Sequence, residues 1–195
     1  MTISRKRNIT AIAIYIASAI AASGCTSSAP APQMQHYILD SAADRLAMTA
    51  KVQKVDVRIA SIPDYLNTNN LVMQTEDHQM VLARYHAWAN RLSDSIASIV
   101  AFEVNEQVAG KEWADDCVAC QDIALHIEHF YPTSQGDVFL VGHFEYSGLN
   151  KEKQRIRFSY AGEMEAGGYA SAVKEMRALL LQLSGQISES LASAH

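Results

Sequence analysis

A run of apolar residues near the C-terminal end, spaced at steps of three and four, constrains the fold of this chain most. Its members are Tyr169, Val173, Met176, Leu180, Leu183, Ile187 and Leu191. This spacing puts one apolar stripe along about six turns of a helix. Because such a stripe must be buried to be stable, a long amphipathic helix predicts a second layer of structure that covers it. We expect packing on a sheet; the alternative is an exposed seam that serves as a partner groove or a coiled-coil strand.

Three segments with strand character come before this helix in quick succession. Apolar and polar residues alternate over 122–130 and, strictly, over 155–160, while 138–146 is apolar on both faces, as in a central strand. Short polar loops at 133–137 and 147–150 join the three segments. This arrangement predicts an antiparallel meander.

Shorter strand candidates and a second helix occupy the first half of the chain. The strand candidates are 36–40, 52–59, 71–74 and 80–85. The second of them is expected to end before Pro63, because proline lacks the N–H that a ladder needs.

Helical spacing of apolar residues then extends over 92–108, with Asn90 or Ser93 as the expected N-cap and Gly110 as the expected stop. The fold class predicted from these elements is α+β: a two-layer domain in which a mainly antiparallel sheet packs against two amphipathic helices.

The N-terminal 24 residues have the organisation of a bacterial signal peptide. Basic residues 5–7 come before an apolar stretch, 9–22, that is too short to span a bilayer comfortably. The run Ala22-Ser23-Gly24-Cys25 resembles the lipobox of bacterial lipoproteins, although Ala22 stands where that pattern usually has leucine. The resemblance implies that Cys25 carries a diacylglyceryl group on sulfur and a further acyl chain, such as palmitate, on its freed amine. Secretion with a free Cys25 is the alternative.

Such acylation determines the expected location and domain layout. Each buried methylene contributes about 0.8 kcal/mol, so several acyl chains hold a protein on a membrane almost permanently. Thr26 follows the cysteine, where an aspartate would favour the inner membrane, so we expect an outer-membrane lipoprotein that faces the periplasm. Residues 25–35, rich in Ser, Ala and Pro, predict a flexible tether, and 36–195 a single domain.

The charge of the mature chain disfavours nucleic acid as a partner. The signal peptide holds three of the 16 basic residues and none of the 21 acidic ones, which leaves 13 against 21, a net charge of −8. An acidic surface repels phosphate backbones and anionic lipid headgroups. After residue 22 the sequence has no further apolar run long enough to cross a membrane.

Cys117 and Cys120 remain as a Cys-x-x-Cys pair, for which a disulfide in an oxidising compartment is the expected state. A zinc site with His126 and His129 is one alternative, but only five residues separate the two pairs. On a strand, those histidines would also point to opposite faces. A redox site is the other alternative, although such cysteines usually begin a helix after a strand.

We expect no enzyme, cofactor or metal site. The acidic pairs Asp115-Asp116 and Glu163 with Glu165 lie in polar segments and are expected to be solvated. His143 lies in a central strand, where a hydrogen-bonded core or interface histidine is the expectation. No Gly-x-Ser-x-Gly turn or glycine-rich phosphate loop occurs.

Nearly the whole mature chain resembles the PqiC-type family of auxiliary lipoproteins. The likeness is carried by a Pro-x-Tyr-Leu turn within 62–66, by the following strand at 71–72, by the pair Trp88-Ala89 and by Leu92. The lipobox, the meander and the long last helix complete it. Asn90-Arg91 stands where the family often has Glu-Pro, and the Cys117–Cys120 loop is not part of the pattern.

The resemblance implies a non-enzymatic role on the inner face of the outer membrane. Members of the PqiC-type family bind an MCE-domain protein, which is anchored in the inner membrane and spans the periplasm for lipid transport. We therefore expect a docking or scaffolding component, with a ring-shaped homo-oligomer as one form. The alternative is a lipid- or ligand-binding lipoprotein with its own apolar cavity.

The turn that carries this resemblance is also the candidate partner-binding site. Tyrosine and tryptophan anchor interfaces at low entropic cost, whereas the alternative for each of them is a place in the core. The candidate residues are Pro63, Asp64, Tyr65, Leu66 and Trp88.

Overall fold

The structure is a computed structural model, and it describes residues 31–46, 54–76, 78–109, 111, 121–147 and 152–194. The chain divides into two units, Met1–Pro32 and Gln33–His195, of which the second is described here. The signal peptide, Cys25, Asp115-Asp116 and the Cys117–Cys120 pair lie outside the described residues. The predictions made for them therefore stay predictions.

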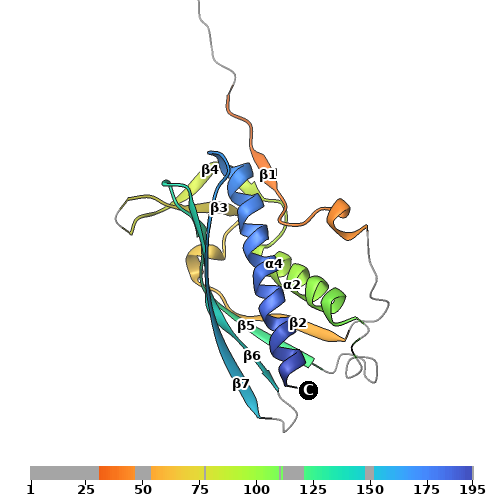
Figure 1. Cartoon of the computed structure of the whole chain (residues 1–195). Coiled ribbons are helices and arrows are strands. Elements are labelled where there is room, and N and C mark those ends of the chain that lie inside the picture. The colour runs from red at the N-terminus through yellow and green to blue at the C-terminus, as the bar shows by residue number, and fades with distance from the viewer. Residues whose placement is uncertain are drawn as a thin grey trace, which may run out of the picture. The chain divides into compact units, whose positions relative to one another are not determined.

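Gln33–His195 contains two mixed sheets (Figure 1). The larger has the order β2-β5-β6-β7, with bounds Val55–Ser61, Gln121–Pro132, Asp137–Ser147 and Lys153–Glu163. Strands β5, β6 and β7 form the predicted antiparallel meander, and β2 joins it in parallel to β5. The smaller has the order β1-β4-β3, with bounds Gln35–Tyr37, Met80–Trp88 and Asn70–Gln74.

The division into two sheets was not predicted, and it follows from how β2 ends. Strand β2 stops at Ser61, just before Pro63, as expected from the missing N–H. A 3₁₀ turn, η2 (Asp64–Leu66), then redirects the chain into β3 of the smaller sheet. The two sheets meet again at a parallel bridge between Gln74 and Thr133.

Two helices pack against the larger sheet and confirm the α+β class. Helix α2 (Leu92–Val108) has the predicted bounds, and α4 (Tyr169–Ser193) contains the predicted apolar stripe. Figure 1 shows α4 lying along the sheet with α2 beside it. The stripe residues from Val173 to Leu191 are buried, which confirms packing on the sheet rather than an exposed seam.

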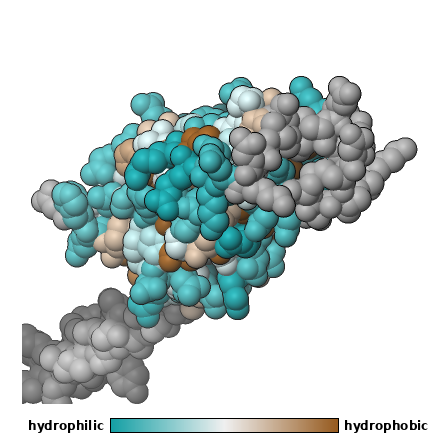
Figure 2. Space-filling view, turned by 90° about the horizontal axis from the view of Figure 1, so that it is seen from below, coloured by the Kyte–Doolittle hydropathy of each residue, from teal (hydrophilic) through white to brown (hydrophobic). Residues whose placement is uncertain are grey.

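Alternation along β6 shows how the sheet meets this helical layer. Val138, Leu140 and Phe144 are fully buried, while Phe139, Val141 and His143, which alternate with them, are partly exposed. Core residues come from both sheets and both helices, so one core serves the whole unit. Figure 2 shows hydrophilic residues over most of the described surface seen from below, with hydrophobic ones in small areas.

A buried asparagine on α2 connects that helix to the edge strand β2. The side-chain oxygen of Asn105 accepts hydrogen bonds from the backbone N–H groups of Lys54 and Val55, at 2.6 and 3.0 Å. Its amide nitrogen donates to the carbonyls of Val55 and Ala101, at 2.8 and 2.6 Å. With both ends of the amide bonded, this polar group is stably held in the core.

The N-cap predicted for α2, Asn90 or Ser93, is wrong. The N-cap position is Arg91, and no side chain bonds the exposed N–H groups there. Ser93 lies inside the first turn, where its hydroxyl donates to Asp94 at 3.2 Å instead. Gly110, the predicted stop, lies outside the described residues.

A β-bulge corrects the expectation that His126 and His129 point to opposite faces. His126 pairs with His143, but His129 pairs with Val141, so Glu128 is an extra residue without a partner position on β6. Positions 141 and 143 of β6 share a face, and the two histidines therefore share it as well.

Gly142 is the position of the sheet where a side chain is least tolerated. A Cβ there would lie 2.1 Å from the backbone oxygen of His126 and 2.8 Å from the ring of Phe158. We expect Gly142→Ala to lower the free energy of unfolding by about 2–3 kcal/mol, because backbone and core must shift. Urea unfolding measures this change.

Gly185→Ala is the matched control, since a Cβ at this position of α4 would have no neighbour within 4 Å. There the same substitution should stabilise the protein by about 0.5–1 kcal/mol through helix propensity. Equal effects at both glycines would contradict this description of the sheet.

Candidate docking surface

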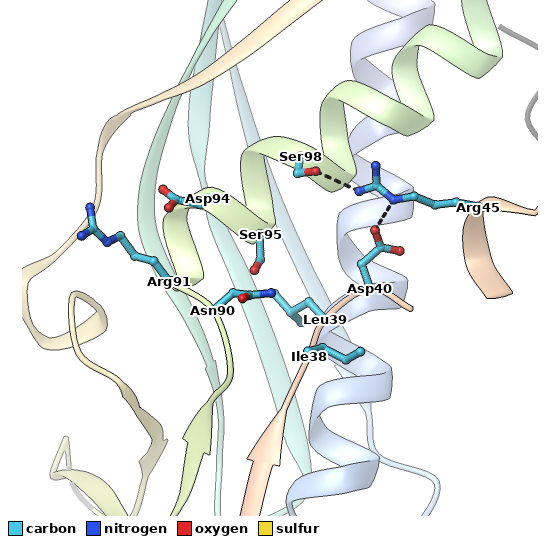
Figure 3. Close-up of a pocket in the computed structure, with 9 residues that line it drawn as sticks. All are labelled: Ile38, Leu39, Asp40, Arg45, Asn90, Arg91, Asp94, Ser95 and Ser98. Carbon is cyan, nitrogen blue, oxygen red and sulfur yellow. Dashed lines mark hydrogen bonds and ion pairs between the residues drawn. The ribbon is translucent and has the colours of Figure 1, made fainter. Parts of the chain in front are cut away.

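Three segments meet around the start of α2 and form what we call the α2 entry surface: residues 38–45, 62–69 and 90–98. A pocket of about 390 Å³ lies on one side of it (Figure 3). The residues that line this pocket are Ile38, Leu39, Asp40, Arg45, Asn90, Arg91, Asp94, Ser95 and Ser98. Ile38 is half exposed and gives an otherwise polar wall an apolar contact point.

A second pocket, of about 330 Å³, adjoins the turn that the sequence singled out for partner binding. It is lined by Ile62, Leu66, Asn67, Thr68, Asn69, Arg91, Leu92 and Ser93. Arg91 lines both pockets, so the position where this chain departs from the family pattern lies at the centre of the surface.

Arg45 closes one end of the first pocket. It forms an ion pair with Asp40 and donates to the hydroxyl of Ser98 at 2.8 Å, so it links the segment after β1 to α2. Figure 3 shows Arg45 and Arg91 at opposite ends of the pocket, with Asn90 and Ser95 between them.

Arg177 of α4 forms ion pairs with the same segment. Its guanidinium lies 3.8 Å from Asp40, 3.4 Å from Asp44 and 3.5 Å from Glu103. Hydrogen bonds from the backbone and hydroxyl of Ser41, and then the charge of Arg177, lower the pKa of Asp44. One cation therefore joins η1 (Ala42–Arg45), α2 and α4.

The predicted partner-binding residues divide between core and surface. Leu66 and Trp88 are buried, with 2 % and 8 % of their surface exposed, and both belong to the core. Pro63 and Tyr65 are partly exposed, and Asp64 is exposed. A partner can thus reach the turn through Pro63, Asp64 and Tyr65, and the binding role itself stays a prediction.

Tyr65 has a structural role beside any role in binding. Its hydroxyl donates to the carbonyl of Glu128 at 3.2 Å, and its ring meets that of Tyr131 edge-on at 6.2 Å between centroids. Burial, and secondarily the neighbouring Tyr131, raise the pKa of Tyr65 to about 12. The ring connects η2 to the bulge of β5.

Among the described residues, the remaining predicted candidates lie apart from one another. Glu163 and Glu165 are exposed, and Glu165 pairs with Lys174 at 2.7 Å. His143 lies on the sheet face opposite the helices. Within the described part of the chain, no helix has both the length and the apolar character needed to cross a membrane.

The chain belongs to the family of ABC-type transport auxiliary lipoprotein components, which matches residues 37–188. This family and the PqiC-type resemblance of the turn agree. The match runs from Tyr37, the last residue of β1, to residue 188 in the last turns of α4.

Curated relatives agree with this assignment, and two solved structures share the fold. The intermembrane transport lipoproteins PqiC of Escherichia coli K12 and of Shigella flexneri are both 25 % identical over 139 residues, which is 69 % of this chain and 73 % of theirs. A crystal structure of an uncharacterized protein has a TM-score of 0.65 at 20 % identity, over 81 % of this chain and 98 % of that one. A Xanthomonas campestris protein has a TM-score of 0.55 at 10 % identity, over 83 % and 93 %. These two structures support the fold alone.

The sequence analysis missed Arg45, which lines the first pocket, and Arg177 of α4, which pairs with Asp40 and Asp44 of the same segment. Arg177 follows Met176 directly and lies four residues after Val173, at the edge of the apolar stripe. A single arginine at the margin of a long stripe is a usable signal, because burial there requires acidic partners. The partners themselves come from distant segments and leave no local pattern.

Replacing Arg177 should destabilise the protein through the acidic side chains left behind. With Arg177→Met, three carboxylates keep their places but lose their shared cation, so we expect a loss of about 1–3 kcal/mol in the free energy of unfolding. The side chains of Arg177 and Asp40 are only 18 % and 15 % exposed, which limits screening by solvent.

Lys174→Met on the same helix is the control. It breaks an ion pair whose members are 68 % and 74 % exposed, and should leave the free energy of unfolding nearly unchanged. Urea unfolding of both variants separates the two cases. A loss at Lys174 as large as at Arg177 would refute the role given to the buried cation.

Proposed function

We propose that the protein is an outer-membrane lipoprotein that docks or scaffolds a periplasm-spanning partner in a trans-envelope lipid-transport system. The observation that carries this proposal is the match of residues 37–188 to the transport auxiliary lipoprotein family. The lipobox-like run that ends in Cys25 and the names of the PqiC relatives support it.

The proposed mechanism is binding rather than catalysis. Acyl chains on Cys25 fix the chain in the inner leaflet of the outer membrane, and residues 26–35 serve as a tether. Strand β1 follows the tether directly, and the segment after β1 is tied to α2 and α4 through Arg45 and Arg177. Load on the tether therefore reaches β1 first, and these ion pairs hold the chain beyond β1 to the helical layer.

The proposed partner is an MCE-domain protein anchored in the inner membrane, and the proposed contact is the α2 entry surface. Its two pockets, the half-exposed Ile38 and the exposed Asp64 offer polar and apolar contacts side by side. Arg91 places a positive charge between the two pockets, although the mature chain as a whole has a net charge of −8. A ring of several copies would present this surface repeatedly to one tubular partner.

In-cell photocrosslinking tests this proposal. A photoreactive amino acid at position 64 or 91 should capture the inner-membrane MCE-type protein, identified by mass spectrometry. The control position is 163, an exposed residue at the end of β7. Capture from position 163 alone, or of no envelope partner from any position, would contradict the docking role.

Lipid analysis of the purified protein distinguishes the alternative of a lipid-binding lipoprotein. The space between helices and sheet is filled by side chains such as Phe130, Phe144 and Leu183, all fully buried. We therefore expect the lipid extracted from the protein to be no more than its own acyl chains. Stoichiometric transported lipid would favour the alternative.

A further inference from the structure

Three side chains that commonly bind metals lie together on the sheet face opposite the helices. His126 of β5 pairs in register with His143 of β6, and Glu145 lies two positions further along β6. Phe144, between the last two, is fully buried in the core, so His143 and Glu145 point to the other face. We call His126, His143 and Glu145 the sheet-face cluster.

The donor atoms of the sheet-face cluster are close enough to share one ion. One ring nitrogen of each histidine and one carboxylate oxygen of Glu145 lie within 4.8 Å of one another. The two imidazole rings stack with their centroids 4.4 Å apart and their planes 7° from parallel. Because zinc–nitrogen bonds are about 2.0–2.1 Å long, the two rings must rotate out of their parallel stack before all three donors can bind one ion.

A second layer of residues already orients both rings. The Nδ1 atom of His126 lies 2.9 Å from the hydroxyl of Ser61, and that of His143 lies 3.5 Å from the carboxylate of Glu128. Metal-bound histidines usually have such a partner on the nitrogen that does not bind the ion. The arrangement leaves Nε2 of each ring for a ligand, and the β-bulge supplies Glu128.

The carboxylate of Glu145 keeps one oxygen available to an ion. Arg155 donates two hydrogen bonds to this carboxylate. Both of these bonds, at 2.8 and 2.6 Å, go to Oε1, which leaves Oε2 for an ion.

We propose that His126, His143 and Glu145 form a binding site for a divalent transition metal of the zinc or copper type, with one coordination position open. Imidazole nitrogen with a single carboxylate selects these ions over calcium or magnesium, which prefer oxygen ligands. Bound metal would cross-link β5 and β6 beside the bulge. This site is independent of the docking role and is contrary to our expectation of no metal site.

Zinc titration of the full-length acylated protein in detergent tests the site. The protein is prepared without a histidine tag. Every sample carries Cys117→Ser and Cys120→Ser, which we call the background protein, because thiolates would otherwise compete for zinc. Competition with a chromophoric chelator should give one Zn²⁺ per chain. His126→Gln and His143→Gln should each weaken binding by at least about tenfold, and Ser61→Ala by about tenfold.

His129→Gln is the matched control, since this residue lies on the same strand and face but outside the cluster. It should leave zinc affinity unchanged.

Circular dichroism checks that each variant is folded. Electron paramagnetic resonance of Cu²⁺ bound to the background protein gives a second measurement that needs no histidine variant. Coupling to two nitrogen nuclei supports the site. Absence of stoichiometric binding, absence of nitrogen coupling, or equal zinc affinity in folded His126→Gln and His129→Gln proteins would overturn it.

Discussion

Burial of the apolar stripe of α4 against the larger sheet is the constraint on which the rest of the structure depends. Leu180, Leu183 and Ile187 are fully buried, and they meet a sheet whose central strand turns Leu140 and Phe144 toward them. Each Å² of apolar surface that this packing buries contributes about 25 cal/mol to stability. The burial also commits one face of the sheet to packing, so polar chemistry is confined to the opposite face and to the margins of the helical layer.

The elements with long periodic patterns could be predicted from the sequence. Helix α2 has the predicted bounds, and the meander and α4 follow their apolar periods closely. Periodicity works here because a continuous buried face requires the same residue type at every turn or every second position. Pro63 also ended its strand as expected, since a missing N–H acts locally.

The rest depends on contacts between distant segments, for which local patterns carry little information. The parallel pairing of β2 with β5 unites residues some 65 positions apart. Simple alternation predicted that His126 and His129 point to opposite faces of the sheet. The bulge at Glu128 puts them on the same face. Asn105 and Arg177 are polar residues with little exposed surface, and partners on distant segments satisfy their hydrogen bonds and charge. The sequence around each residue does not show those partners. For the candidate site, the turn at Pro63 was found from sequence, whereas its companion pocket at Arg45 required the structure.

One account fits the family membership, the acidic domain and the lipobox-like leader. In this account, a lipid anchor holds a binding domain at the membrane, where it faces the periplasm. Its central claim is that Cys25 is acylated and holds the protein at the outer membrane. Mass spectrometry of the N-terminal peptide, taken from the outer-membrane fraction of the native host, tests this directly. The account predicts a chain that begins at Cys25 and carries the mass of the added acyl groups. An unmodified N-terminus on protein recovered from the soluble periplasm would contradict it.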